Sequence, residues 1–265
     1  MIEIQKTLPE FGRVALALVS VLIILAGAVA GEIRVMASGG FSAPYDKVIP
    51  EYERATEDTV VTVYGASMGG APDSIPIRLQ RGEAADVVIL ASTALEELVR
   101  QGKVVAGSRV DLARSSIGMA VRAGAPRPDI STVEALTRML LQVTSIAYSA
   151  SASGTYVSTE LFLRLGIADQ VKEKSQRIEG ERVGNVVARG DVEIGFQQIS
   201  ELLPIEGIDY VGRLPDEVQR VTIFSAGIVT GAKNPDGARS LIEYLSSLSL
   251  APLIIESGLE PVVSE

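Results

Sequence analysis

The sequence predicts an α/β fold, and two observations carry that prediction. Short β-branched and apolar runs alternate along the chain with segments that have the spacing of amphipathic helices. Most of the strand segments are apolar without interruption, which is typical of buried parallel strands. In folds of this class ligands bind where strands end and helices begin.

The expected elements follow one another along the chain after residue 31. Strands are expected at Ile33–Ala37, Val60–Tyr64, Asp86–Leu90, Ile117–Arg122, Ser145–Tyr148, Ile194–Gln197 and Val221–Thr230. Helices are expected at Pro44–Arg54, Thr93–Gln101, Thr132–Leu141, Thr155–Leu165, Arg182–Arg189 and Gly237–Ser247. We expect Ser42 to cap the first helix, with Pro44 in its first turn and a kink at Pro50.

Composition excludes several classes of function. The chain has 265 residues, with no Cys and no His, so it cannot form a disulfide, a zinc site of the usual kind or a Ser-His-Asp triad. Its 33 acidic and 24 basic residues give a formal charge of −9, which argues against nucleic acid as a partner because phosphate contacts need clustered Lys and Arg. An anionic ligand must therefore be held by local geometry.

Residues 1–30 have the pattern of a secretory signal peptide. Lys6 and Arg13 precede an apolar run from Val14 to Val29, and small residues at Ala28 and Ala30 predict cleavage before Gly31. The alternative is an uncleaved membrane anchor, for which the run is shorter than the ~20 residues that a spanning helix needs. We therefore expect a periplasmic mature protein.

Three small-residue loops follow strands and are candidate ligand loops. They are residues 37–42, 65–70 and 148–156, the last reading Tyr-Ser-Ala-Ser-Ala-Ser-Gly-Thr-Tyr. A loop of this kind at the start of a helix presents backbone N–H groups and hydroxyls to an anion. The plainer interpretation is a solvated loop whose serines cap a helix.

The second loop also matches the Gly-x-Ser-x-Gly pattern of hydrolases, at Gly65, Ser67 and Gly69. That pattern needs a base to take the serine proton, and the chain has no histidine and no Ser-x-x-Lys sequence. We therefore interpret these glycines as turn formers.

An ordered set of segments resembles the periplasmic molybdate-binding proteins and their broader relatives among ABC-transporter solute-binding proteins. The segments are Ala37-Ser38 after a strand, residues 78–89, Gly154-Thr155-Tyr156 with Leu165-Gly166, residues 190–196, and residues 257–261. The set covers essentially the whole mature chain, although no single motif in it is specific.

This resemblance implies a two-lobed, type II periplasmic binding protein fold, in which each lobe is a central β-sheet flanked by helices. The chain would cross between lobes near Ile117–Val121 and Val221–Val229. Lobe 1 would then be residues 31–116 plus 225–265, and lobe 2 residues 117–224.

The resemblance also implies a set of ligand contacts. Ser38 with Gly39 matches the first donor loop, and Ser67, or Ser74 if an insertion is counted, matches the second. Ser151 lies near the family's third-loop donor, Val183 loosely at its helix-start donor, and Gln198 at its tyrosine position. Apart from the resemblance, the residues themselves add the rest of the third loop, and they add a guanidinium near the first crossing that could clamp a carboxylate: Ser149, Ser153, Gly154, Thr155, Tyr156 and Arg114. The plainer interpretation of Arg114 is a surface residue.

We therefore predict a monomeric solute-binding protein, not an enzyme, that needs no cofactor or metal. It would capture a small anion, either an organic carboxylate or an oxyanion such as molybdate, and deliver it to an ABC permease in the inner membrane. Closure of the lobes on the anion would be the mechanism.

Two rival functions stay open. The resemblance extends to aconitate isomerase, a cofactor-free enzyme that moves a proton along a tricarboxylate, and Glu, Asp, Lys or Tyr can serve as its base. A signalling or adhesion module is the other alternative.

Overall fold

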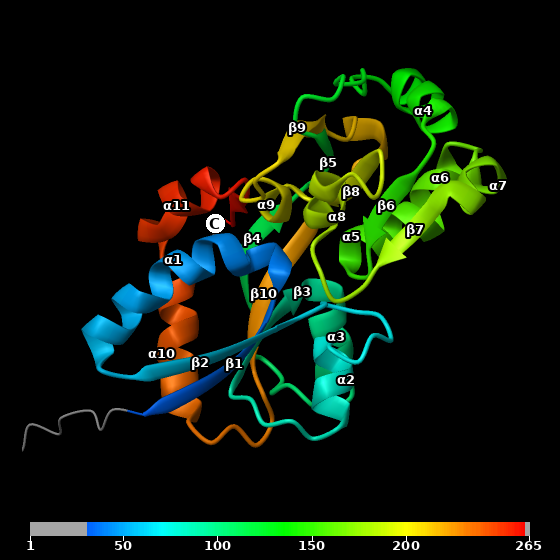
Figure 1. Cartoon of the computed structure of the whole chain (residues 1–265). Helices are drawn as coiled ribbons and strands as arrows, with labels where there is room; N and C mark the ends of the chain where they lie inside the picture. Colours follow the sequence, from blue (N-terminus) through cyan, green and yellow to red (C-terminus); the bar gives the residue numbers. More distant parts are fainter. Residues whose placement is uncertain (1–30, 263–265) are drawn as a thin grey trace, which may run out of the picture.

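The computed structural model describes residues 31–262, which form two β-sheets with helices packed on both faces of each (Figure 1). The strands of the first sheet lie in the order β11 (Glu260–Pro261), β4 (Val110–Ser115), β10 (Thr222–Ile228), β3 (Val87–Ala91), β1 (Glu32–Ser38) and β2 (Thr59–Gly65). The strands of the second lie in the order β7 (Ser175–Ile178), β6 (Ile146–Ser149), β8 (Ile194–Gln198), β5 (Ile117–Arg122) and β9 (Ile208–Arg213).

Both sheets are mixed, with a parallel part that includes the strands leading to the pocket. In the first sheet β1 pairs in parallel with β2 and β3, whereas β10 runs antiparallel to β3 and β4. In the second sheet β6 pairs in parallel with β7 and β8, and β5 runs antiparallel to β8 and β9. The expected fold class, a central sheet flanked by helices in each half, is confirmed.

The helices and helical turns belong to the two halves as follows. The first half has α1 (Gly39–Thr56), α2 (Ile75–Gln80), α3 (Ser92–Arg100), α10 (Pro235–Leu245), a 3-10 turn at Leu248–Leu250 and α11 (Ala251–Glu256). The second has α4 (Val133–Gln142), α5 (Ala152–Tyr156), a π-helical turn at Val157–Leu161, α6 (Phe162–Arg164), α7 (Ala168–Val171), a 3-10 turn at Lys172–Lys174, α8 (Val183–Arg189), α9 (Ile199–Leu202) and a 3-10 turn at Asp216–Val218.

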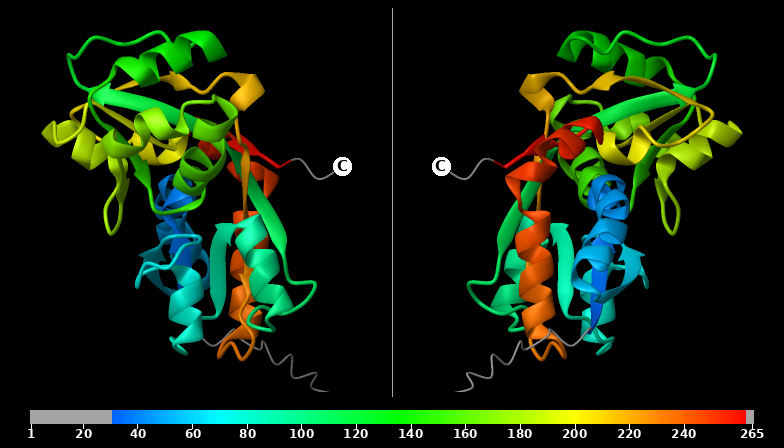
Figure 2. Two further views of the ribbon diagram at one scale, coloured as in Figure 1. Left: turned by 90° about the vertical axis from the view of Figure 1, so that its right-hand side faces the viewer. Right: turned by 90° about the vertical axis from the view of Figure 1, so that its left-hand side faces the viewer.

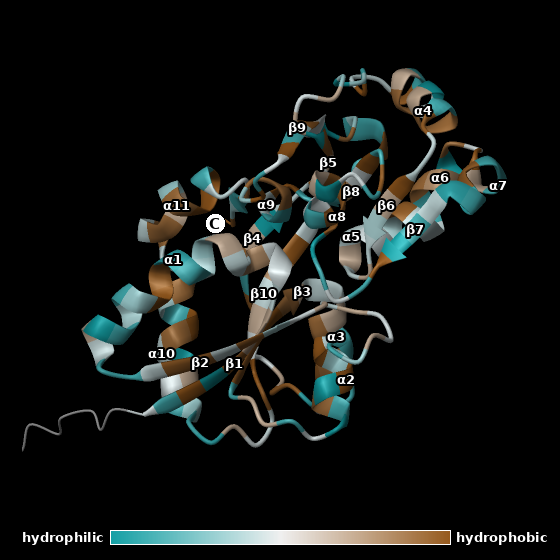
Figure 3. Cartoon of the chain, in the orientation of Figure 1, coloured by the Kyte–Doolittle hydropathy of each residue, from teal (hydrophilic) through white to brown (hydrophobic). Residues whose placement is uncertain are grey.

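Strands β1 and β3, in the interior of the first sheet, bury apolar side chains on both faces because helices cover both faces. Val35 and Ile89 face α1 and α10, whereas their neighbours Met36 and Val88 face α2 and α3. Side chains alternate between the faces of a strand, so a strand covered on both sides needs an unbroken apolar run. Figure 3 shows these strands largely in hydrophobic colours, with banded helices such as α10 over them.

Two segments connect the halves, which lie one above the other in the side views (Figure 2). The chain passes from β4 to β5 at Ser116 and returns between β9 and β10. The second boundary expected from the sequence, between residues 224 and 225, falls within β10, and β10 as a whole pairs with β3 and β4 in the first sheet. That the halves act as two moving lobes stays a prediction.

Helix α1 begins earlier than expected, at Gly39, so Ser42 lies inside it and does not cap it. The Ser42 hydroxyl donates to the Gly39 carbonyl at 2.7 Å. The sequence did not predict this first turn because it begins with Gly39 and Gly40, and glycine has a low helix propensity. Gly40 is required by packing, since a β-carbon there would lie 2.1 Å from the ring of Phe224.

Four strands were not predicted from the sequence: β4, β7, β9 and the two-residue β11. All four carry charged residues and lie at a sheet edge or next to one, so they lack the apolar run of a buried strand. Within residues 31–262 no single helix is long and apolar enough to cross a membrane. Helix α10 and the helical segment Leu248–Glu256 reach that length and apolar composition only together, and the pair is bent by 48° at the break between them. The expected signal peptide, residues 1–30, lies outside the described residues.

Candidate functional site

A pocket of about 290 Å³ lies between the two sheets, where strands from both halves end. Its wall includes Ser38 at the end of β1, Gly65 at the end of β2, Ser149 at the end of β6 and Gln197 near the end of β8. The sequence placed candidate loops at three of these strand ends. The tertiary structure brings all three loops to one place.

The first two loops meet through their serines. The Ser67 hydroxyl donates to the Ser38 hydroxyl at 2.8 Å and accepts from the backbone N–H of Ala91 at 3.0 Å. Ser38 lines the pocket, and Ser67 is fully buried behind it. Ser74, the alternative second-loop residue, donates instead to the Gly69 carbonyl within its own loop.

The third loop reaches across from the second sheet. The Ser151 hydroxyl accepts the backbone N–H of Ser67 at 3.0 Å, which joins the two halves over the pocket. Behind it, the hydroxyls of Ser149 and Ser153 share a hydrogen bond of 3.0 Å. Ser149 and Ser151 line the pocket, whereas Ser153 does not. Gly154 is needed for packing, since a β-carbon there would lie 1.6 Å from the Ser149 carbonyl oxygen.

Arg182 brings a positive charge to the pocket wall. It precedes α8 and is partly buried, and its Nη2 donates to the Ser42 hydroxyl on α1 at 2.8 Å. This contact also bridges the two halves. Arg182 is the one cation among the residues that line the pocket, so an anion bound there would meet a positive charge as well as neutral donors.

Glu201, on α9, presents a buried carboxyl group to the same pocket. Glu201 is 8% exposed. Its Oε1 lies so close to Gly39 that a β-carbon at that glycine would be 2.5 Å from it. Burial raises the pKa of this carboxyl group to about 7, against the opposing influence of Arg182 and of a hydrogen bond from Gln197. Near neutral pH the group can therefore accept or release a proton.

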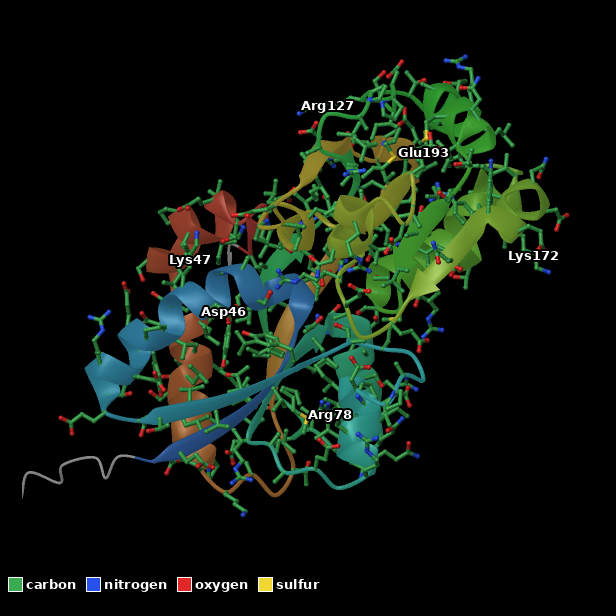
Figure 4. The ribbon with its side chains drawn as sticks, viewed as in Figure 1. Asp46, Lys47, Arg78, Arg127, Lys172 and Glu193 are labelled. Carbon is green, nitrogen blue, oxygen red and sulfur yellow. The ribbon has the colours of Figure 1, made fainter. Side chains whose placement is uncertain are left out.

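The outer rim of the pocket holds a tyrosine and an aspartate. Tyr64, at the end of β2, lines the pocket and donates its hydroxyl to Asp46 of α1, which Figure 4 labels on that helix. Burial and this bond to a carboxylate raise the pKa of Tyr64, because both disfavour the phenolate. Tyr64 therefore stays a neutral hydroxyl at the rim.

Gln198 does not line the pocket, although the resemblance implied that it is a ligand contact. Its side chain accepts from Ser115 at 2.8 Å and donates to Thr222 at 3.0 Å. These partners end β4 and begin β10, next to the two connections between the sheets. Strand alternation turns Gln197 into the pocket and Gln198 towards those connections.

Four other candidates are also placed away from the pocket or engaged elsewhere. Arg114 is half exposed, and its side chain lies 3.6 Å from that of Glu260. The Val183 N–H donates to the Gln197 side chain at 2.9 Å, Thr155 donates to the Ser151 carbonyl at 3.0 Å, and the buried Tyr156 donates to the Val218 carbonyl at 2.7 Å. Of the candidates from sequence, Ser38, Gly39, Ser149 and Ser151 line the pocket, with Ser67 directly behind.

The sequence analysis missed Arg182, Glu201, Gln197 and Tyr64. Glu201 carried a weak signal, because it is an acidic residue next to the apolar pair Leu202-Leu203 in the segment directly after a buried strand. Arg182 carried none, since nothing local separates it from the other basic residues. Within residues 31–262 no cluster of three or more acidic side chains is arranged to hold a metal ion.

The chain has named relatives over most of its length. It is 44% identical over 258 residues, 97% of this chain and 98% of the relative, to the aconitate isomerase of a Pseudomonas species. It is 27% identical, over 86% of this chain and 90% of the relative, to the molybdate-binding protein ModA of Azotobacter vinelandii. The first relative is an enzyme, and it overturns our prediction that the chain is not one.

Solved structures and a family model agree with the fold. The periplasmic molybdate-binding protein of Azotobacter vinelandii superposes with a TM-score of 0.69 at 18% identity, covering 88% of this chain and all of that structure. The family model described as bacterial extracellular solute-binding protein matches residues 33–260. Since that match spans nearly all of the described residues, the chain belongs to the bacterial extracellular solute-binding protein family, with the fold of the molybdate-binding proteins.

Proposed function

We propose that this protein is an isomerase that shifts a proton within a small unsaturated polycarboxylate of the aconitate class. The observation that carries the proposal is the pocket between the sheets, in which a cation, hydroxyl donors and an ionisable carboxyl group face one volume. The 44% identity to an aconitate isomerase over 97% of the chain supports it.

The pocket is suited to carboxylate groups. The Arg182 guanidinium can form paired hydrogen bonds to one carboxylate, and Ser38, Ser149 and Ser151 offer hydroxyl donors to another. Ser38 precedes α1 and makes no capping hydrogen bond to it, so the first N–H groups of an 18-residue helix also face this region. At about 290 Å³ the volume stands at the small end of the ~300–1,000 Å³ typical of ligand pockets.

The contacts between the halves support binding with closure. Ser151 to Ser67 and Arg182 to Ser42 join opposite walls of the pocket. A polycarboxylate that binds both walls would stabilise this arrangement by its differential affinity for it, and closure would exclude water from the reacting carbons.

The direct test is to incubate the purified exported protein with trans-aconitate and follow its conversion to cis-aconitate by proton NMR. We expect conversion without added metal or cofactor. A protein that leaves every aconitate signal unchanged, while molybdate raises its melting temperature, would favour oxyanion capture instead.

We further propose that the protein works in the periplasm, which the family description and the pattern of residues 1–30 support. An inner-membrane permease as partner stays a prediction that only the family description supports. Pull-down of a permease with ligand-loaded protein would test it.

A further inference from the structure

Glu201 is held differently from the other buried acid of the described chain, Asp86. The two carboxylate oxygens of Asp86 accept the backbone N–H groups of Arg34 at 2.8 Å, Lys233 at 2.6 Å and Asn234 at 3.0 Å. Those three bonds tie three segments of the first half together, so Asp86 has a structural role. An acid that is buried for structure is normally satisfied in this way.

Glu201 has no comparable set of donors. Its hydrogen-bond partner is the side chain of Gln197, and Arg182 is the charged group that acts on it. A buried, weakly compensated carboxyl group costs stability, so this placement favours a role in chemistry. Because the carboxyl group lies at the pocket wall beside Ser38 and Arg182, a bound polycarboxylate would lie against it.

We propose that Glu201 is the group that carries the proton between two carbons of the substrate, an inference that rests on the proposed isomerase function. In the first step a Glu201 oxygen takes a proton from the methylene carbon next to a carboxylate. The electron pair of that C–H bond forms a double bond to the central carbon. The pair of the old double bond moves to its far carbon, which then takes the proton back from Glu201. The atoms and electrons balance with no oxidant, water or cofactor.

The neighbours of Glu201 fit the two halves of this cycle. The base must be deprotonated before the first step, and it must then hold the substrate proton until the second step. A pKa of about 7 allows both. Arg182 can bind the carboxylate that gains negative charge when the adjacent carbon is deprotonated. Gly39 leaves room for the carboxyl group, since any side chain there would occupy the position of Oε1.

Three other ionisable side chains also line the pocket. They are Tyr64, which donates to Asp46, then Asp73, which precedes α2, and Glu181, whose carboxylate is paired with Arg189 at 2.8 Å. Of these three, Glu181 is exposed, Asp73 is partly buried and Tyr64 stays protonated, whereas Glu201 is a buried carboxyl group at the pocket wall.

The test compares wild type, Glu201→Gln, Glu201→Asp and the exposed surface control Glu243→Gln in the full exported protein. Aconitate is the probe, and three quantities are measured: isomerisation, exchange of the methylene protons with D₂O by NMR, and the rise in melting temperature that aconitate causes. We expect Glu201→Gln to lose both isomerisation and exchange by about 10²- to 10⁴-fold, while the rise in melting temperature remains. Glu201→Asp should retain part of both rates, and Glu243→Gln should match wild type.

A pH profile adds a readout that a structural role would not move. For wild type, log(kcat/KM) should rise with pH and level off near the pKa of the free carboxyl group, and in Glu201→Asp this bend should move. If Glu201→Gln folds poorly, the Glu201→Asp profile carries the test alone.

The outcomes separate this inference from the proposed function. Wild-type exchange and isomerisation in Glu201→Gln, or an unmoved bend in Glu201→Asp, would overturn the role of Glu201 and leave the isomerase standing. A wild-type protein that binds aconitate but neither exchanges nor isomerises it would overturn the proposed function, and this inference with it.

Discussion

The hydroxyl of Ser200 donates to the carbonyl of Gly40 at 2.7 Å and so joins α9 of one half to α1 of the other. In a regular helix that carbonyl would accept the N–H of the fourth residue along, but here that residue is Pro44, which has no N–H. The proline leaves an acceptor free inside α1, and a serine from the opposite half fills it. Ser200 is fully buried, so this bond lies beside Glu201 in a region without water.

Replacing Ser200 by Ala should therefore destabilise the fold by about 1–3 kcal/mol, the cost of a buried carbonyl without a partner. In Pro44→Ala, residue 44 regains the N–H that can reach the Gly40 carbonyl, so adding Ser200→Ala to it should cost much less. Urea unfolding of wild type, both single variants and the double variant measures this coupling. Strictly additive effects would show that Pro44 does not determine the Ser200 bond.

Arg182→Met should lower kcat/KM for aconitate by about 10- to 100-fold. The substitution keeps much of the apolar stem and removes the guanidinium that faces the pocket, and a hydrogen bond to a charged group contributes about 1.5–3 kcal/mol. Arg114→Met is the matched control, because Arg114 lies near Glu260 and does not line the pocket. Steady-state kinetics of both variants decide the assignment, and an equal loss in both would contradict it.

Ser38→Ala should weaken aconitate binding by about 0.5–3 kcal/mol, with the upper end applying if the hydroxyl meets a carboxylate. The same change also leaves the buried Ser67 hydroxyl without its acceptor, so a small loss of stability should accompany it. Ser246→Ala, at an exposed position on the far end of α10, is the control. Calorimetric titration with aconitate gives both affinities. Unchanged affinity in Ser38→Ala would remove this serine from the site.

The stability of the fold should fall as pH rises from about 4.5 to about 7 because of Glu201. Its carboxyl pKa is raised from 4.5 to about 7 by burial, so in this window the folded protein binds more protons than the unfolded chain. The neutral form stabilises the fold at low pH, and that contribution is lost as the group ionises. The full effect is up to about 3 kcal/mol.

Glu201→Gln removes this titration, so its advantage in melting temperature over wild type should be larger at pH 8 than at pH 5. Melting curves at the two pH values measure it, with Glu243→Gln on the exposed face of α10 as control. An advantage that is the same at both pH values would mean that the carboxyl group is ionised throughout the range.

The sequence by itself determined seven of the eleven strands of the described residues, the small-residue loops and the fold family of this protein. The run Val87–Ala91 is apolar because helices cover both faces of β3, so the residue pattern itself indicates burial. The serine loops were visible for a similar reason: hydroxyl and glycine residues at the end of a strand are local features. Their positions in the chain therefore indicate where the pocket lies.

Only the tertiary structure decided which charged groups enter the pocket. Arg182 meets Ser42 across 140 positions of sequence, and Glu201 faces Gly39 from a short helix of the other half. No local pattern encodes such a meeting, because it depends on how two sheets with separate cores are placed against each other. The same placement turned Gln198 towards the connections and left Arg114 near Glu260. The family resemblance had suggested Gln198 as a ligand contact, whereas Arg114 had been suggested by its guanidinium.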